Sequence, residues 1–183
     1  MPRTLYVHAF CVADLDGDGR ADFVADPQPR DAFSMTAYVL WNDLPAPLTR
    51  ARAQVRDASL SAFALDTAAD LDSANGLDLV VLAPVPFATS PGATVWLNQG
   101  GRLGFTALPQ VVVAARSGTL ADVDDDGLAD LVLVNDVSAT VVVMLSQGGG
   151  RFGAPITLTG TADGPPIVAH VSCDRRPDII ASD

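Results

Sequence analysis

The stretch Asp14-Leu-Asp16-Gly-Asp18-Gly-Arg20-Ala-Asp22 places aspartate at positions 1, 3, 5 and 9 of a nine-residue pattern. Residues 122–130 form a second complete copy, and residues 70–78 and 170–178 form incomplete copies. In chain order we call these segments loop 1 (14–22), loop 2 (70–78), loop 3 (122–130) and loop 4 (170–178). The loops start about fifty residues apart, a period typical of propellers and other arrays of stacked structural repeats.

The composition around these loops favours strands over helices. All 22 acidic residues are aspartate and all 11 basic residues are arginine, so the helix formers glutamate and lysine are absent. The 15 glycines and 13 prolines favour turns between short apolar runs. The sequence therefore predicts one all-β domain over residues 1–183, with repeats at about 1–56, 57–113 and 114–160 and a partial repeat at 161–183.

Each complete repeat is expected to supply four short antiparallel strands, as a propeller blade does. Apolar runs lead into the loops, as at residues 6–10 and 61–65, and the alternating segment 50–56 suits a strand with one solvent-facing side. Further strands are predicted directly after the loops, at 21–25, 77–82, 129–134 and 178–181, and as third strands at 37–41, 93–97 and 139–145. The predicted architecture is a β-propeller segment of about three and a half blades.

A second recurring feature follows the third strand. The turn Asn98-Gln-Gly-Gly-Arg102-Leu-Gly104-Phe105 is similar to Ser146-Gln-Gly-Gly-Gly-Arg151-Phe152-Gly153. With these turns and the aspartate loops, nearly the whole chain resembles the FG-GAP/VCBS repeat family. The resemblance implies a β-propeller, commonly seven-bladed, with calcium in loops between the first two strands of a blade. That family includes the head of integrin α-subunits, several fungal lectins and many microbial surface proteins.

The loops offer the oxygen ligands that calcium prefers. Calcium takes six to eight oxygens at about 2.3–2.6 Å, and side chains at positions 1, 3 and 5 of a curling loop converge on one centre. A carbonyl at position 7 and a carboxylate at position 9 can complete most of the shell. The predicted ligands are Asp14, Asp16, Asp18, the Arg20 carbonyl and Asp22 in loop 1, and Asp122, Asp124, Asp126, the Leu128 carbonyl and Asp130 in loop 3. Without a cation, carboxylates this close would repel one another.

The incomplete loops are weaker candidates for calcium. Loop 2 keeps Asp70, Asp72 and Asp78, but position 5 is alanine, and Asn75 is the alternative source of an oxygen. Loop 4 has His170 and Ser172 in place of two carboxylates, so we expect no calcium there. Zinc held by His170 and Cys173 is disfavoured, because no cluster of further ligands lies nearby in the sequence.

An EF-hand is excluded because its position 12 requires a bidentate glutamate, whereas Ala25 and Leu133 stand there. Cys11 and Cys173 occupy non-equivalent positions in their repeats and can pair only if the first and last repeats meet. Two buried thiols are the favoured interpretation, with the disulfide left open.

No catalytic constellation is visible, and the chain is predicted not to be an enzyme. Residues 148–153 match Gly-x-Gly-x-x-Gly, but a dinucleotide site needs a helix to begin there. Pro155 and the β-branched run at 156–159 disfavour that helix, so a hairpin turn is expected. The net charge of −11 argues against nucleic acid as a partner, and no apolar run is long enough to span a membrane.

Three repeats and part of a fourth fall short of a closed ring, which usually has about four to eight blades. We therefore expect the ring to be completed by another protein chain, by the rest of a longer polypeptide or by a second copy. The predicted function is a non-enzymatic calcium-binding module for extracellular protein recognition or structural assembly. The location, extracellular or at the cell surface, rests on the resemblance and on calcium chemistry; Met1 to His8 show no signal-peptide pattern.

The alternative functions are a carbohydrate-binding lectin and an accessory propeller domain of a larger enzyme. A lectin requires aromatic platforms for sugars, and the candidates are Trp41, Trp96, Tyr38 and Phe87. Because Trp41 and Trp96 occupy equivalent positions at the third strand, core packing is the favoured role for both.

Overall fold

The computed structural model describes residues 6–28, 38–42, 68–83, 92–109, 113–135, 137–172, 174 and 176–182. Over these residues the chain forms strands β1 to β13 and no helix, and the strands pair in antiparallel sheets of two to four members. The predicted all-β fold is therefore confirmed for the described part of the chain.

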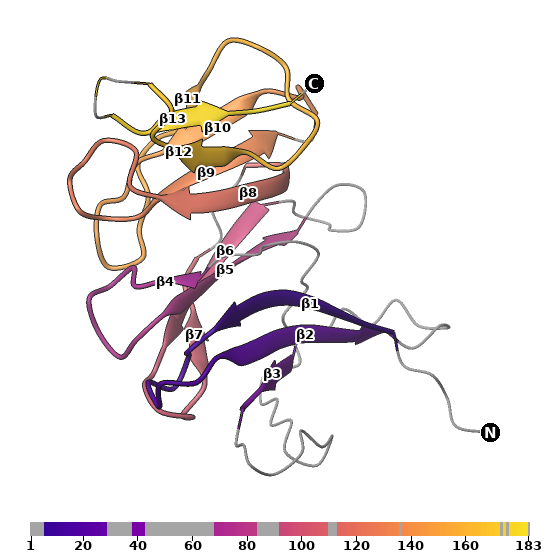
Figure 1. Cartoon of the computed structure of the whole chain (residues 1–183), viewed down its shortest axis with the longest axis vertical. Helices are drawn as coiled ribbons and strands as arrows, with labels where there is room; N and C mark the ends of the chain where they lie inside the picture. The colour runs from indigo at the N-terminus through magenta and orange to yellow at the C-terminus, as the bar shows by residue number, and fades with distance from the viewer. Residues whose placement is uncertain are drawn as a thin grey trace.

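Each of the four sheets is built from strands that are consecutive in the sequence (Figure 1). Sheet 1 contains β1 (Tyr6–Ala13), β2 (Asp22–Gln28) and β3 (Tyr38–Leu40). Sheet 2 contains β4 (Ala68–Ala69), β5 (Asp78–Ala83), β6 (Gly92–Asn98) and β7 (Phe105–Ala107). Sheet 3 contains β8 (Ala115–Ala121), β9 (Asp130–Asn135), β10 (Val141–Met144) and β11 (Ile156–Thr157). Sheet 4 contains β12 (Ile167–Ala169) and β13 (Asp178–Ile180).

The strands that follow the loops and the three third strands lie where the sequence predicts them. The strands predicted at 50–56 and 61–65 fall outside the described residues. Each sheet lies within one of the four predicted repeats, while the repeat boundaries themselves stay predictions. The described sheets form an open stack, so closure into a propeller also stays a prediction.

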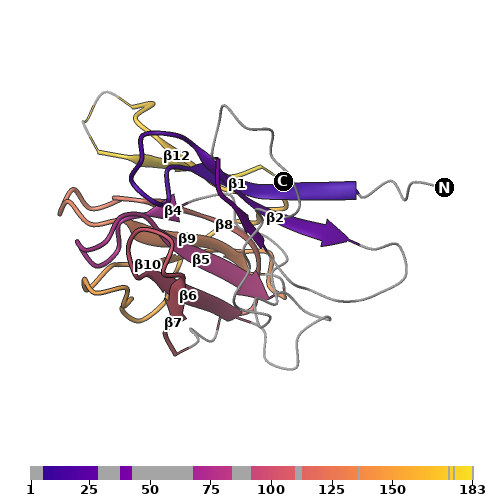
Figure 2. The same cartoon turned by 90° about the horizontal axis from the view of Figure 1, so that it is seen from below.

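The sheets stack in chain order, from sheet 1 at the bottom of Figure 1 to sheet 4 at the top. The view from below shows the first strands β1, β4, β8 and β12 toward one side and the later strands toward the other (Figure 2). Because each loop joins a first strand to a second strand at the same end of its sheet, all four loops lie along one edge of the stack, on the left in Figure 1.

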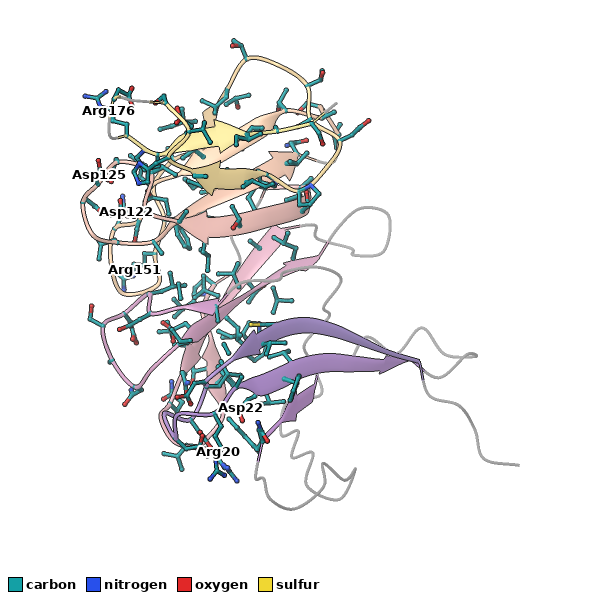
Figure 3. The ribbon with its side chains drawn as sticks, in the orientation of Figure 1. Arg20, Asp22, Asp122, Asp125, Arg151 and Arg176 are labelled. Atoms are coloured by element: carbon teal, nitrogen blue, oxygen red, sulfur yellow. The ribbon has the colours of Figure 1, made fainter. Side chains whose placement is uncertain are left out.

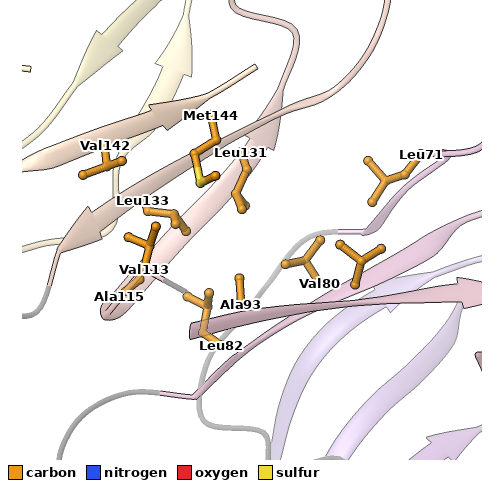
Figure 4. Close-up of a cluster of buried hydrophobic side chains, with 11 residues drawn as sticks. Leu71, Val80, Leu82, Ala93, Val113, Ala115, Leu131, Leu133, Val142 and Met144 are labelled. Atoms are coloured by element: carbon orange, nitrogen blue, oxygen red, sulfur yellow. The ribbon is translucent and has the colours of Figure 1, made fainter. Parts of the chain in front are cut away.

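Alternation along the second strands gives the inner sheets two buried faces. On β9, Leu131 and Leu133 pack toward sheet 2, whereas Val132 and Val134 pack toward sheet 4. The largest cluster, between sheets 2 and 3, comprises Leu71, Val80, Leu82, Ala93, Val95, Val113, Ala115, Leu131, Leu133, Val142 and Met144 (Figure 4). Burying both faces explains why these strands read as continuous apolar runs.

Cys11 belongs to the buried cluster between sheets 1 and 2. Cys173 lies outside the described residues, so the question of a disulfide between these two cysteines stays open.

Candidate metal centres

The ninth residue of each loop ties that loop to the strands of its own sheet. In sheets 1 to 3 its Oδ2 accepts a hydrogen bond from the amide of loop position 2, and its Oδ1 accepts one from an amide at or just after the end of the third strand. The pairs are Asp22 with Leu15 (3.0 Å) and Asn42 (2.8 Å), Asp78 with Leu71 (2.8 Å) and Asn98 (2.8 Å), and Asp130 with Val123 (2.8 Å) and Ser146 (2.7 Å). All three carboxylates are buried, and we call this arrangement the aspartate clamp.

Loops 1 and 3 curl in the same way around the carboxylate at position 1. Asp14 Oδ1 accepts the Asp18 amide at 3.1 Å, and Asp14 Oδ2 accepts the Gly19 amide at 2.8 Å. In loop 3, Asp122 accepts the amides of Asp126 and Gly127 at the same two distances. The glycine at position 6 has φ of +84° in loop 1 and +88° in loop 3, which glycine adopts readily. Gly19 and Gly127 thus permit the sharp bend at position 6 of both loops.

Carboxylate oxygens converge in three of the four loops to within 4.8 Å of one another. The converging groups are Asp14, Asp16 and Asp18 in loop 1, Asp70, Asp72 and Asp78 in loop 2, and Asp122, Asp124 and Asp130 in loop 3. The structure thus brings together part of each predicted ligand set. The remaining predicted ligands, Asp22, the Arg20 carbonyl, Asp126 and the Leu128 carbonyl, belong to the same loops, and their role toward a metal stays a prediction.

Loops 2 and 4 keep only part of this arrangement. In loop 2, Asp70 accepts the Ser73 amide at 2.7 Å, and Asn75 has a positive φ of 62° and lies against the turn at Gly100. In loop 4, Asp178 accepts the Val171 amide at 2.9 Å, which reproduces half of the clamp. The exposed side chain of His170 is in none of the three converging groups.

Negative charge accumulates in the loops. Desolvation raises the pKa of Asp124, and the neighbouring charges of Asp126 and Asp130 raise it further. Burial raises the pKa of Asp22 and Asp78, although the backbone hydrogen bonds of the clamp act in the opposite direction. In all three carboxyls the largest cause is the loss of solvation, which disfavours the ionised form.

One loop carboxylate is paired with a cation from the neighbouring sheet. Arg102, in the turn between β6 and β7, donates from Nε to Asp16 Oδ2 at 2.7 Å, and its guanidinium lies 5.4 Å from the ring centroid of Trp41. Arg151 is exposed at the similar turn of sheet 3 and forms no ion pair among the described residues (Figure 3). Its turn lies against loop 2, where the Gly150 amide donates to the Leu71 carbonyl at 2.9 Å. Arg102 and Asp16 belong to different sheets and are 86 residues apart in the sequence, so the loop motif alone could not predict their contact.

The two candidate tryptophans are buried in the cluster between sheets 1 and 2, as core packing predicts. Phe87 lies outside the described residues, and the side chain of Tyr38 is not described. The glycine segment 148–153 forms a turn closed by a bridge between Ser146 and Phe152, and no helix begins there. The predicted hairpin turn is confirmed. Among the described residues, no helix is long and apolar enough to cross a membrane.

Comparison with known proteins identifies a fold relative. Three solved chains match, and one is a lectin of Agrocybe aegerita, described for its specific recognition of non-reducing terminal N-acetylglucosamine. The match has a TM-score of 0.59 at 20% sequence identity and covers 97% of this chain but 46% of the lectin chain. At this identity the likeness shows the fold alone. No family model matches the chain, and no curated protein matches it.

Proposed function

We propose that this chain is a non-enzymatic lectin segment, a carbohydrate-binding stack of β-sheets whose aspartate loops hold calcium. The observation that carries the proposal is the fold match, over 97% of the chain, to a lectin that recognises non-reducing terminal N-acetylglucosamine. The first ligand class to test is therefore a glycan that ends in this sugar. Such a module works outside the cell or at its surface.

The fold we propose is a β-propeller of the FG-GAP/VCBS type. Consecutive antiparallel strands in each sheet, sheets stacked in chain order and first strands on one side all support it. The aspartate clamp supports it as well, because the same contacts recur in sheets 1, 2 and 3. The chain spans less than half of the matched lectin. In the proposed propeller, further sheets from a partner chain or a longer polypeptide complete the ring.

Calcium is the metal that fits the donor set of loops 1 and 3. These loops offer only oxygen, which suits a hard cation and disfavours zinc. Asp14, Asp16 and Asp18 would hold the ion in loop 1, and Asp122, Asp124 and Asp130 would hold it in loop 3. Bound calcium would offset the carboxylate repulsion and stiffen the connection between the first two strands of each sheet.

A second candidate, extracellular protein recognition or structural assembly, is favoured by the burial of both tryptophans. A buried ring cannot stack on a sugar, so two of the four candidate aromatic platforms are removed. Under this function the calcium-stiffened stack serves as a scaffold, and its partner is a protein.

Isothermal titration calorimetry separates the two candidates. We expect an oligosaccharide ending in N-acetylglucosamine to bind the calcium-loaded chain, and a galactose-terminated control of the same length not to bind. Binding by neither oligosaccharide, with calcium stabilisation intact, would contradict the lectin function and leave assembly. Sugar binding that persists unchanged in excess chelator would instead show that sugar recognition does not require calcium in the aspartate loops.

A further inference from the structure

The carbonyl at position 2 of loops 1 and 2 is bonded to the turn that follows the third strand of the next sheet. In loop 1 the Leu15 carbonyl accepts a hydrogen bond from Asn98 Nδ2 at 2.7 Å. In loop 2 the Leu71 carbonyl accepts one from the Gly150 amide at 2.9 Å. Leu15 and Leu71 are 1% and 3% exposed. The same acceptor is therefore held from the neighbouring sheet at two successive places in the stack.

The two turns supply the donor in different ways. In sheet 2 the turn begins at Asn98, and the side chain itself reaches the preceding loop. In sheet 3 the equivalent residue is Ser146, whose hydroxyl accepts an amide of its own turn at 3.2 Å, and the backbone amide of Gly150 reaches loop 2 instead. A Cβ added at Gly150 would lie 2.9 Å from two leucine side chains, so this close approach requires glycine.

The Asn98 side chain is buried, and each of its polar atoms has a hydrogen-bond partner. It is 3% exposed, and Nδ2 also donates to the Leu77 carbonyl of loop 2 at 3.1 Å. Its Oδ1 accepts the Gly100 amide at 2.9 Å, and its backbone amide donates to the clamp residue Asp78. A buried polar group with all of these bonds is rigid. Asn98 is therefore fixed by sheet 2 and directs one N–H at loop 1.

Leu15 connects two of the residues that we propose as calcium ligands in loop 1. It lies between Asp14 and Asp16, and its own amide donates to the clamp residue Asp22 at 3.0 Å. With Asn98 on its carbonyl, both peptide groups that flank Leu15 are held, one by its own sheet and one by sheet 2. These peptide groups orient the two aspartates, so Asn98 can act on the ligands without contacting the metal.

We propose that Asn98 is a positioning residue for calcium in loop 1, acting from the neighbouring sheet through the Leu15 carbonyl. The inference rests on the calcium part of the proposed function. Holding the loop in one conformation before the ion arrives lowers the ordering cost of binding, so this bond favours calcium. Arg102 of the same turn acts in the opposite sense, because it compensates the charge of Asp16.

Asn98→Ser is the variant that tests the proposal, because serine stands at the equivalent position of sheet 3. Its hydroxyl can accept the Gly100 amide, as Ser146 does in its own turn, but it is too short to reach Leu15. Gln99→Ala is the matched control, because Gln99 is exposed and donates to the Leu97 carbonyl within sheet 2.

The first readout is amide hydrogen exchange in metal-free buffer, followed by NMR. The Asp18 and Gly19 amides donate to the carboxylate at position 1 of loop 1. In Asn98→Ser they should exchange about 5-fold faster than in the wild type, because one hydrogen bond that holds the loop is lost. The corresponding amides of Asp126 and Gly127 in loop 3 should not change, and Gln99→Ala should change neither loop.

The second readout is calcium affinity, measured by calorimetry in the Asp124→Ala chain, in which loop 3 is disabled. Adding Asn98→Ser should weaken calcium binding about 5-fold, and adding Gln99→Ala should not. Faster exchange in loop 1 with unchanged calcium affinity would overturn the positioning role.

The exchange readout also separates this proposal from the proposed function. Wild-type exchange rates in loop 1 of Asn98→Ser would overturn the proposal whether or not the chain binds calcium. Equal acceleration in loops 1 and 3 would overturn it as well, since that result means a general loss of stability. A wild-type chain that binds no calcium would instead contradict the calcium part of the proposed function, and the role of Asn98 toward calcium would fall with it.

Discussion

Loops 1 and 3 share their sequence pattern, the amide bonds from positions 5 and 6 to the carboxylate at position 1, and the clamp, but their surroundings differ. In loop 1 the side chain of Asp16 is 6% exposed and paired with Arg102 from sheet 2. The corresponding Asp124 of loop 3 is exposed, has a raised pKa and forms no ion pair among the described residues. Sheet 4, the neighbour of loop 3, contributes two described strands and no turn equivalent to the one that carries Arg102. The nine residues thus set the shape of a loop, and the next sheet sets its electrostatic environment.

The largest effect we expect is the loss of stability when the clamp is broken, and it should be equal for loops 1 and 3. Asp22→Asn and Asp130→Asn each turn a buried carboxylate that accepts two backbone N–H groups into a carboxamide. Its oxygen can still accept one N–H, but its NH2 group faces the other and cannot accept from it. Each variant should lose about 3 kcal/mol of unfolding free energy, because hydrogen bonds to charged groups are strong and an unpaired buried amide is costly. Urea unfolding in metal-free buffer measures this loss.

Asp126→Asn is the control for the clamp variants, because Asp126 is exposed and, among the described residues, accepts only the local Leu128 amide. It should change the unfolding free energy by less than about 0.5 kcal/mol. A clamp variant no less stable than this control would show that the ninth aspartate does not hold the strands together.

The calcium affinities of the two loops should differ by about 10-fold, equivalent to about 1.4 kcal/mol. Asp124→Ala disables loop 3 and leaves loop 1, whereas Asp16→Ala disables loop 1 and leaves loop 3. Because Arg102 already compensates part of the charge in loop 1, the Asp16→Ala chain should retain the tighter site. Calorimetric titration with calcium compares the two variants. The reverse order of affinity would show that Arg102 does not weaken calcium binding at loop 1.

Arg102→Gln should make loop 1 resemble loop 3. Without calcium it should destabilise the chain by about 1 kcal/mol, since a partly exposed ion pair and a ring contact are lost. With calcium it should bind the ion several-fold more tightly at loop 1. Arg151→Gln is the matched control and should alter neither property. Equal calcium affinities for Arg102→Gln and the wild type would show that the neighbouring sheet does not tune the loop.

The smallest expected effect is a pH dependence specific to loop 3. The pKa of Asp124 is raised above 3.8 in the folded chain, so the folded state takes up its proton at a higher pH than the unfolded state. In metal-free buffer the contribution of this group to stability is therefore greatest below 3.8 and is lost as pH rises through the folded pKa. In Asp124→Asn, the urea midpoint should depend less on pH in this range. An unchanged profile would show that a group other than Asp124 causes the pH dependence.

Local features of this fold could be predicted from the sequence, and contacts between sheets could not. Aspartate spacing and apolar runs predict the loops and the strands beside them, because both depend on neighbours in the chain. The short strands β7 and β11, each of two or three residues, carry too little pattern to be detected. The pair between Arg102 and Asp16 and the bond from Asn98 to Leu15 join residues 86 and 83 positions apart, so only the stacking of sheets reveals them.

The most direct test of the account is thermal unfolding of the full chain in about 1 mM calcium and in excess chelator, with magnesium at the same concentration as a control. A site with a dissociation constant near 10 μM gains about 2.7 kcal/mol under these conditions. We predict a clear rise in melting temperature that calcium produces and magnesium does not, reduced by Asp16→Ala or Asp124→Ala and abolished by the two together. A melting temperature unaffected by calcium or chelator would contradict the claim that the aspartate loops are structural metal centres.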